Sequence, residues 1–147
     1  MSKAFAGIGT QLQRSGDAGV TYVTIAEMTK IQGSGSKADV IDVTNMDSPT
    51  AYREKLVTLL DAGDIALDGN LVADDATQAS VQADFDARAL NKWRIVLPVD
   101  PDTSVSRGRW DFEAFVSGVD FDIQHDKQAT ISAKLAITGP RPFTVGA

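Results

Sequence analysis

The sequence predicts a mostly β protein, a β-sandwich or barrel with one flanking α-helix. Hydrophobic and polar residues alternate with a period of two along most of the chain, which is typical of strands with one buried and one wet face. One alanine-rich segment breaks this pattern and contains neither glycine nor proline. Glycine, proline, serine and aspartate gather between these segments, where turns are expected.

Three long segments carry the strand signal most clearly. Residues 20–27 are rich in β-branched and aromatic side chains. Residues 129–138 alternate with Ala136 as a neutral exception, and residues 110–117 alternate with Phe115 as an exception. A further run at 121–125 could continue this last strand after a glycine. Shorter strands are predicted at residues 38–43, 64–72 and 93–97.

The predicted helix covers residues 74–89. Asp74 and Asp75 stand at its start, where carboxylates stabilise the N-terminus of a helix. An alanine-rich face and a second face with Val81 and Phe85 are both mildly apolar, so the helix has no single stripe. Either the alanines lie at the edge of the sheet, or they contact another subunit.

Residues 44–63 form a long segment with weak alternation. Pro49 interrupts it, and apolar residues cluster between Leu56 and Leu60. The pattern leaves open whether residues 50–60 are a short helix or part of an extended arm. Long segments of this kind inside a compact domain are often functional.

Composition limits the classes of function. The 147 residues fit one domain, and no apolar run approaches the roughly 20 residues of a membrane span. Twenty acidic against 14 basic residues give a net charge of −6, which argues against a nucleic-acid-binding surface. The chain has no cysteine and one histidine, which excludes disulfides, thiolate nucleophiles and the common multi-histidine metal sites.

Candidate catalytic groups do not converge in the sequence. His125 is near Asp120, Asp122 and Asp126, but on one strand the histidine points away from the three aspartates. No nucleophile elbow, phosphate-binding loop or calcium loop occurs. We therefore predict no enzymatic activity, no cofactor and no metal, and we expect Trp93 and Trp110 in the core.

A family resemblance spans almost the whole chain. It is carried by seven segments whose order and spacing are more specific than any one of them: residues 7–14, 25–33, 42–49, 52–55, 59–65, 94–98 and 135–139. In these segments the sequence resembles the tail tube (major tail) proteins of long-tailed, lambda-like siphophages, a family that includes the tail tubes of gene transfer agents.

This resemblance implies a structural virion protein. Such proteins have a tail tube fold with a long arm loop between strands, and they form hexameric rings that stack into a hollow tube. The tube passes double-stranded DNA without specific binding, and it contacts the tape measure, tail terminator and distal tail proteins but no membrane. The protein would be in the virion tail after assembly in the cytoplasm of the bacterial host.

The resemblance also assigns roles to parts of the single domain 1–147, which would comprise an N-terminal arm (1–6), an interaction arm (44–63), the helix (74–89) and a C-terminal arm (139–147). The expected subunit-interface residues are Phe5, Met46, Asp47, Pro49, Tyr52, Arg53, Leu56, Leu59 and Phe143. Four acids on the wet faces of strands are expected to line the lumen and repel phosphates: Asp111, Glu113, Asp120 and Asp122.

Two alternatives remain open at this stage. The chain could be another tail component of related fold, such as a terminator or distal tail protein. It could also be a monomeric β-sandwich that binds a ligand, such as a carbohydrate, through Trp93 or Trp110. The resemblance also does not separate a phage from a gene transfer agent.

Overall fold

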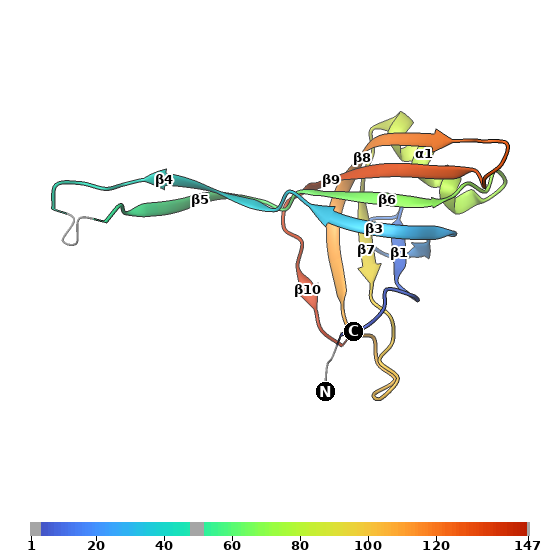
Figure 1. The fold of residues 1–147 in the computed structure, drawn as a ribbon, viewed down its shortest axis with the longest axis horizontal. Coiled ribbons are helices and arrows are strands. Elements are labelled where there is room, and N and C mark those ends of the chain that lie inside the picture. Colours follow the sequence, from blue (N-terminus) through green and yellow to red (C-terminus); the bar gives the residue numbers. More distant parts are fainter. Residues whose placement is uncertain (1–3, 48–51, 147) are drawn as a thin grey trace.

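The computed structural model describes residues 4–47 and 52–146, which form ten strands and one helix (Figure 1). The strands of the body are β1 (Gln11–Ser15), β2 (Val23–Thr24), β3 (Met28–Ser34), β6 (Asp64–Asn70), β7 (Leu90–Val96), β8 (Arg109–Asp122), β9 (Thr130–Thr138) and β10 (Phe143–Thr144). The other two strands, β4 (Lys37–Asp42) and β5 (Lys55–Asp61), form a separate hairpin, and the helix is α1 (Ala76–Ala87). This helix is too short to cross a membrane, and no other helix occurs in the described part of the chain.

The body is one antiparallel sheet that bends into two layers. Its strands follow the order β2-β1-β7-β8-β9-β6-β3, and β10 adds to the start of β8. β8 belongs to both layers, because its first half pairs with β7 and its second half pairs with β9. The register shifts between Val116 and Gly118, where a bulge bends the strand. As a result, β3, β6 and β9 cross the direction of β1 and β7 (Figure 1).

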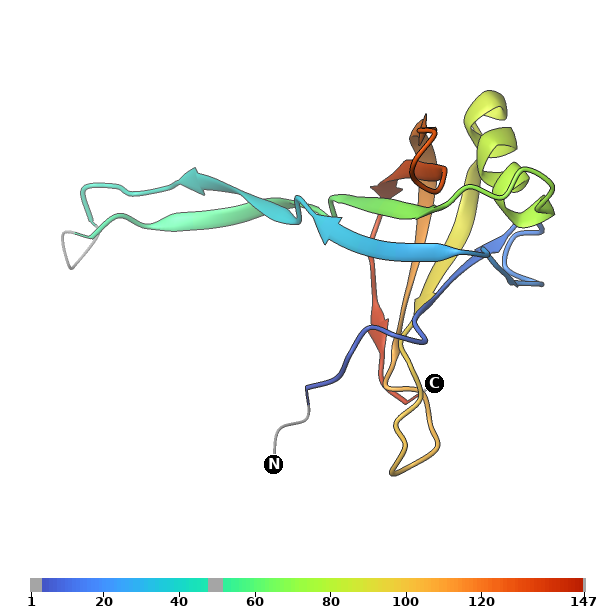
Figure 2. The ribbon, with the colours of Figure 1, turned by 45° about the vertical axis from the view of Figure 1, so that its right-hand side comes forward.

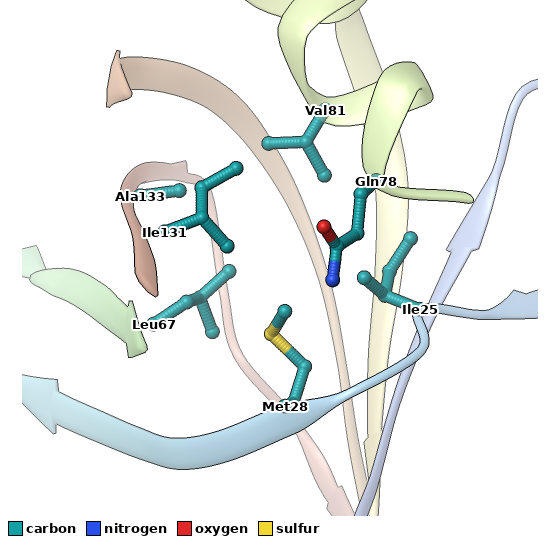
Figure 3. Close-up of a pocket in the computed structure, with 7 residues that line it drawn as sticks. All are labelled: Ile25, Met28, Leu67, Gln78, Val81, Ile131 and Ala133. Carbon is teal, nitrogen blue, oxygen red and sulfur yellow. The ribbon is translucent and has the colours of Figure 1, made fainter. Parts of the chain in front are cut away.

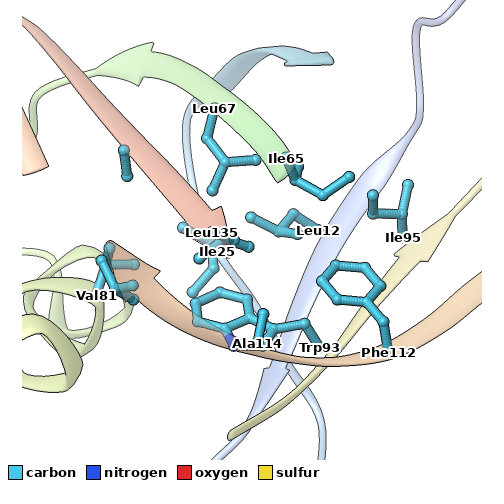
Figure 4. Close-up of a cluster of buried hydrophobic side chains, with 12 residues drawn as sticks. Leu12, Ile25, Ile65, Leu67, Val81, Trp93, Ile95, Phe112, Ala114 and Leu135 are labelled. Atoms are coloured by element: carbon cyan, nitrogen blue, oxygen red, sulfur yellow. The ribbon is translucent and has the colours of Figure 1, made fainter. Parts of the chain in front are cut away.

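The hydrophobic core fills the space between the two layers. Trp93, Leu12 and Leu135 are completely buried there, and Phe112 and Ile65 pack among them (Figure 4). The alternation of the sequence produces this core, because every second residue of β7, β8, β9 and β6 points inward. The prediction that both tryptophans lie in the core is confirmed for Trp93 and holds only in part for Trp110. Trp110 is partly exposed and packs against the edge of the core.

Helix α1 covers one end of the core. Asp75 caps its N-terminus and accepts bonds from the hydroxyl and the N–H of Thr77, which lower the pKa of Asp75. The face turned to the sheet carries Gln78, Val81 and Asp84. Gln78 and Val81 extend from the helix toward Ile25, Leu67 and Ile131 (Figure 3). The Gln78 amide donates to the carbonyl oxygens of Ala26 and Asn70, so the helix is tied to the loop before β3 and to the end of β6.

The prediction of a strand over residues 20–27 is wrong for most of that segment. Only Val23 and Thr24 pair with β1, after which Ile25 turns into the core. Glu27 has φ +61°, so the chain reverses there before β3 begins. The β-branched composition of residues 20–27 therefore reflects one buried side chain and a short edge strand. The longer strands are β1 and β3, whose sequence patterns are less regular.

The segment that the sequence left open is extended. Residues 55–61 form β5, which pairs with β4 in a hairpin that projects from the body (Figure 2). The arm is therefore longer than residues 44–63, because β4 forms its other half. Pairing within the hairpin satisfies the backbone groups that face the partner strand, which a single extended segment could not do.

Candidate assembly surfaces

The arm carries apolar side chains on both of its faces. Val40 and Val57 are paired on one face, and Ile41 and Leu56 are paired on the other. Seven apolar side chains of the arm expose between 41% and 80% of their surface: Val40, Ile41, Val43, Leu56, Val57, Leu59 and Leu60. An isolated hairpin is at best marginally stable in water. We therefore expect both apolar faces of the arm to contact another protein surface.

The root of the arm is a corner with a defined direction. Gly35 and Gly63 both have a positive φ, and a side chain on Gly63 would collide with the carbonyl oxygen of Ser34. The hydroxyl of Ser36 donates to the carbonyl oxygen of Ala62 across the corner, at 2.8 Å. Arg141 donates in turn to the Ser36 hydroxyl at 3.1 Å. The corner therefore holds the arm away from the body.

The predicted interface residues of the arm lie along β5 and in the segment beyond the paired strands, at the far end of the arm. Met46 is fully exposed, and Tyr52 and Leu59 expose more than 70% of their surface. Asp47 and Arg53 are also exposed, and Leu56 lies within β5. Pro49 lies outside the described residues. The described residues among them therefore belong to one projecting element. Val40 and Ile41 of β4 belong to the same element, and the prediction did not include them.

The two aromatic candidates near the termini contact their own chain. The Phe143 ring packs against Trp110 with ring centroids 4.8 Å apart, and β10 pairs with β8 at this point. The guanidinium of Arg107 lies 4.8 Å from the centre of the Phe5 ring. Both phenylalanines remain partly exposed, so their role between subunits stays a prediction.

The second layer of the body is a four-stranded sheet with two open edges. Its strands are β3, β6, β9 and the second half of β8. β3 pairs only with β6. Residues 116–122 of β8 pair only with β9, because β7 ends opposite Phe115. Within the described chain, no strand therefore pairs with the outer side of either edge.

The four acidic lumen candidates divide between the two layers. Asp111 and Glu113 are opposite Arg94 and Lys92 of β7, on the outer side of the first layer. Asp120 and Asp122 are opposite Ser132 and Thr130 of β9, on the outer side of the second layer. All four face away from the core because the bulge at residue 117 shifts the alternation by one residue.

Their electrostatic surroundings also differ. Arg94 donates to Asp111 at 2.8 Å, and Arg109 donates to the other oxygen of this carboxylate at 3.2 Å. Asp120 takes part in none of the ion pairs found among the described residues, and neither does Asp122. The charge of Asp111 is thus compensated, whereas the charges of Asp120 and Asp122 face solvent.

No metal centre is found in the part of the chain that the structure describes. No group of three histidine, cysteine, aspartate or glutamate residues within residues 4–47 and 52–146 could hold a metal ion. Trp93 is completely buried and is not available to stack on a ligand. The exposed apolar side chains of the arm and the two open strand edges are suited to contact with other protein chains.

A comparison with known families and structures agrees with this assessment. The profile of the phage tail tube protein family matches residues 10–143. The chain belongs to the phage tail tube protein family. No curated protein matches the chain.

Solved tail structures share the fold of this phage tail tube protein. The tail of an empty gene transfer agent particle, refined with C6 symmetry, superposes with a TM-score of 0.74 at 19% identity, covering 97% of this chain and 100% of that one. A chain of the anti-feeding prophage baseplate gives a TM-score of 0.75 at 10% identity, covering 99% and 98%. The SPP1 tail tube gives 0.65 at 10% identity, covering 92% and 75%.

Family and fold together give the phage tail tube protein a structural role in the tail of a phage or phage-like particle. The sequence resemblance to this family is thus confirmed, as is the mostly β fold with one helix. The open edges of the second layer are the feature that sequence reasoning missed. No local signal marks them, because a strand pattern does not show which strands lack a partner.

Proposed function

We propose that copies of the chain close into six-membered rings through the two open edges of the second layer, and that the rings stack into a hollow tube. The observation that carries the proposal is this four-stranded sheet, open at both edges. The strands alternate in direction from β3 to β8, so β8 of one copy is antiparallel to β3 of the next when all copies point the same way. Each copy would add four strands to one continuous barrel, which leaves no edge unpaired.

The charges of the outer faces support an orientation for the ring. The strands of the second layer carry Lys30 and Lys134 on that face, together with four acids: Asp64, Asp68, Asp120 and Asp122. The first layer carries Lys92, Arg94 and Arg109 against Asp111 and Glu113. These sums, −2 and +1, favour the second layer as the wall of a conduit for DNA, because a net negative wall does not hold phosphates. We therefore place Asp120 and Asp122 in the lumen and Asp111 and Glu113 outside it.

The family resemblance supports the other properties that we propose. The arm would extend beyond its own ring and join it to a neighbouring ring, with Met46, Tyr52 and Leu59 among its contacts. The ends of such a tube would be covered by terminator and distal tail proteins, and a tape measure protein would occupy the lumen before DNA passes. The protein would act without catalysis, and it would assemble in the host cytoplasm before it enters the virion.

Electron microscopy of the purified protein at rising concentration, with sedimentation alongside, tests the proposal. Hollow tubes or six-fold rings are the expected result, and a tube wall one body thick is expected from the single barrel. A protein that stays monomeric at every concentration, even when tail tips that lack a tube are added as initiators, would contradict the proposal. Rings or caps without extended tubes would favour a tail terminator instead.

A further inference from the structure

An apolar groove lies between α1 and the end of β8, at the end of the body away from the arm (Figure 1). It is lined by Leu71, Val72, Ala73, Asp75, Gln78, Ala79, Gln82, Val119, Phe121, Ile123 and Ile131. Phe121 exposes 72% of its surface and Ile123 exposes 66%, although both are large apolar side chains. We propose that this groove receives the arm of a second copy of the chain, in the neighbouring ring. The inference rests on the proposed stacking and names the surface that holds it together.

The groove lies on the opposite side of β8 from the proposed lumen face of the ring. Phe121 is opposite Ile131 of β9, so it lies on the core side of β8, whereas Asp120 and Asp122 lie on the other side. A barrel wall built from the second layer would therefore have the groove on its outer surface, beneath α1. Ala79 contributes a small side chain from the helix, which keeps the groove open to a large apolar partner.

The arm has the complementary chemistry and no partner on its own body. It projects from the body (Figures 1 and 2), and its valines and leucines expose at least 41% of their surface. Because the arm has two apolar faces, contact with a flat surface would cover one face and leave the other exposed to water. A groove with walls from a helix and a strand can cover more than one face of a hairpin.

The direction of the arm brings the two surfaces together in a stack. β4 and β5 continue away from the body where β3 ends and β6 begins, and the groove lies at the opposite end of the same layer (Figure 1). Copies stacked with the same polarity along this direction place the arm of one against the groove of the next. β4 has six residues, about 20 Å, and the seven to nine residues of β6 and β9 span about 23–30 Å. The arm thus reaches across most of one neighbouring sheet.

Cysteine cross-linking tests the contact, because the natural chain contains no cysteine. We would prepare Val57→Cys, on the arm, and Phe121→Cys, in the groove, mix them in equal amounts and treat them with a short bis-maleimide. The matched control replaces Phe121→Cys by Val99→Cys, whose valine is 58% exposed in the loop after β7. The expected result is a covalent dimer that is at least about tenfold more abundant for the Val57→Cys and Phe121→Cys pair than for the control pair. Mass spectrometry of this dimer should show peptides 55–61 and 119–123 joined.

The outcomes separate this inference from the proposed function. Tubes in the microscope without a groove cross-link would overturn the docking and leave the tube intact. A groove cross-link without tubes would support the docking and contradict the stacked tube. Absence of both results would contradict both proposals.

A second measurement uses a variant that does not disturb the fold. Phe121→Ser removes an exposed side chain, so the melting temperature of the monomer should stay unchanged. The protein concentration needed for tubes should rise at least about tenfold, which corresponds to about 1.4 kcal/mol for each contact. Val99→Ser is the control and should change neither value, and equal tube formation by both variants would overturn the inference.

Discussion

At the scale of single residues, Asp84 joins the helix to the sheet. Its carboxylate is 5% exposed and accepts hydrogen bonds from both Nε and Nη2 of Arg14 on β1. A bidentate pair of this kind fixes the rotation of α1 as well as its position. The polar face of the helix, with Gln78 and Asp84 around Val81, explains why the hydrophobic pattern of this segment is so weak.

We expect Asp84→Ala to lower the free energy of unfolding by about 3 kcal/mol, because it leaves the partly buried guanidinium of Arg14 without its partner. Asp86→Ala is the matched control, since Asp86 is exposed on the same helix, and it should change stability by less than about 0.5 kcal/mol. Chemical denaturation of the monomer, followed by tryptophan fluorescence, measures both values. Equal losses for the two variants would show that the ion pair does not stabilise the fold.

At the scale of elements, the arm is a projecting hairpin whose direction depends on one corner. Gly35 and Gly63 provide the backbone conformations, and Ser36 and Arg141 tie the two strands to the C-terminal segment. At the outer end, the Thr44 hydroxyl and N–H donate to Asp42, and with nearby Lys55 they lower the pKa of this carboxyl. The arm is thus ordered at both ends by polar bonds, whereas its middle exposes apolar side chains.

Gly63→Ala should redirect the arm without unfolding the body. A methyl group at this position collides with Ser34 and forces a non-glycine residue into a left-handed conformation, at a cost of about 1–3 kcal/mol. We expect a folded monomer by circular dichroism and a strong loss of tube formation in sedimentation assays. Gly7→Ala, at a position where a side chain meets nothing within 4 Å, serves as the control. Normal tubes from Gly63→Ala would mean that the corner does not set the arm.

At the scale of the whole molecule, the two layers have different outer faces. The second layer is an open sheet with a net negative face, and the first layer carries β10 and a slight positive charge. A ring built from the second layer would put the first layer, with Phe5, Phe143 and the ion pairs of Asp111, on its outside. The same chain can therefore present a wall that repels DNA and an outer surface that does not.

Reversal of the proposed lumen charges tests this arrangement. Asp120→Lys together with Asp122→Lys should leave tube assembly intact, because neither side chain forms an ion pair among those described. DNA ejection from particles that carry these tails should slow severalfold, and added salt should restore it. Glu113→Lys, on the other layer, should eject DNA at the normal rate. Slower ejection with Glu113→Lys alone would place the first layer in the lumen instead.

Much of the fold could be predicted from local patterns. The alternation of β7, β8 and β9 marks their buried faces, and the carboxylates at Asp74 and Asp75 mark the start of the helix. The pattern of residues 44–63 left a helix and an extended arm open, and the family resemblance implied the arm without its partner strand. Residues 37–42 look like any short strand, and only pairing shows that they belong to the arm rather than to the sheet.

The amino-acid pattern is sufficient to predict the class of protein: a mostly β domain with an acidic balance and an apolar segment that has no place in its own core. How these parts act together depends on contacts between distant segments of the folded chain. The bulge at residue 117 shifts Asp120 and Asp122 onto the same side of β8 as Glu113, and the pairing of β8 leaves two edges open. The groove joins Val72, Ala79 and Phe121 from distant segments. Periodicity shows which face of a strand is buried, but edges and grooves depend on which strands are neighbours, and that is a property of the folded chain.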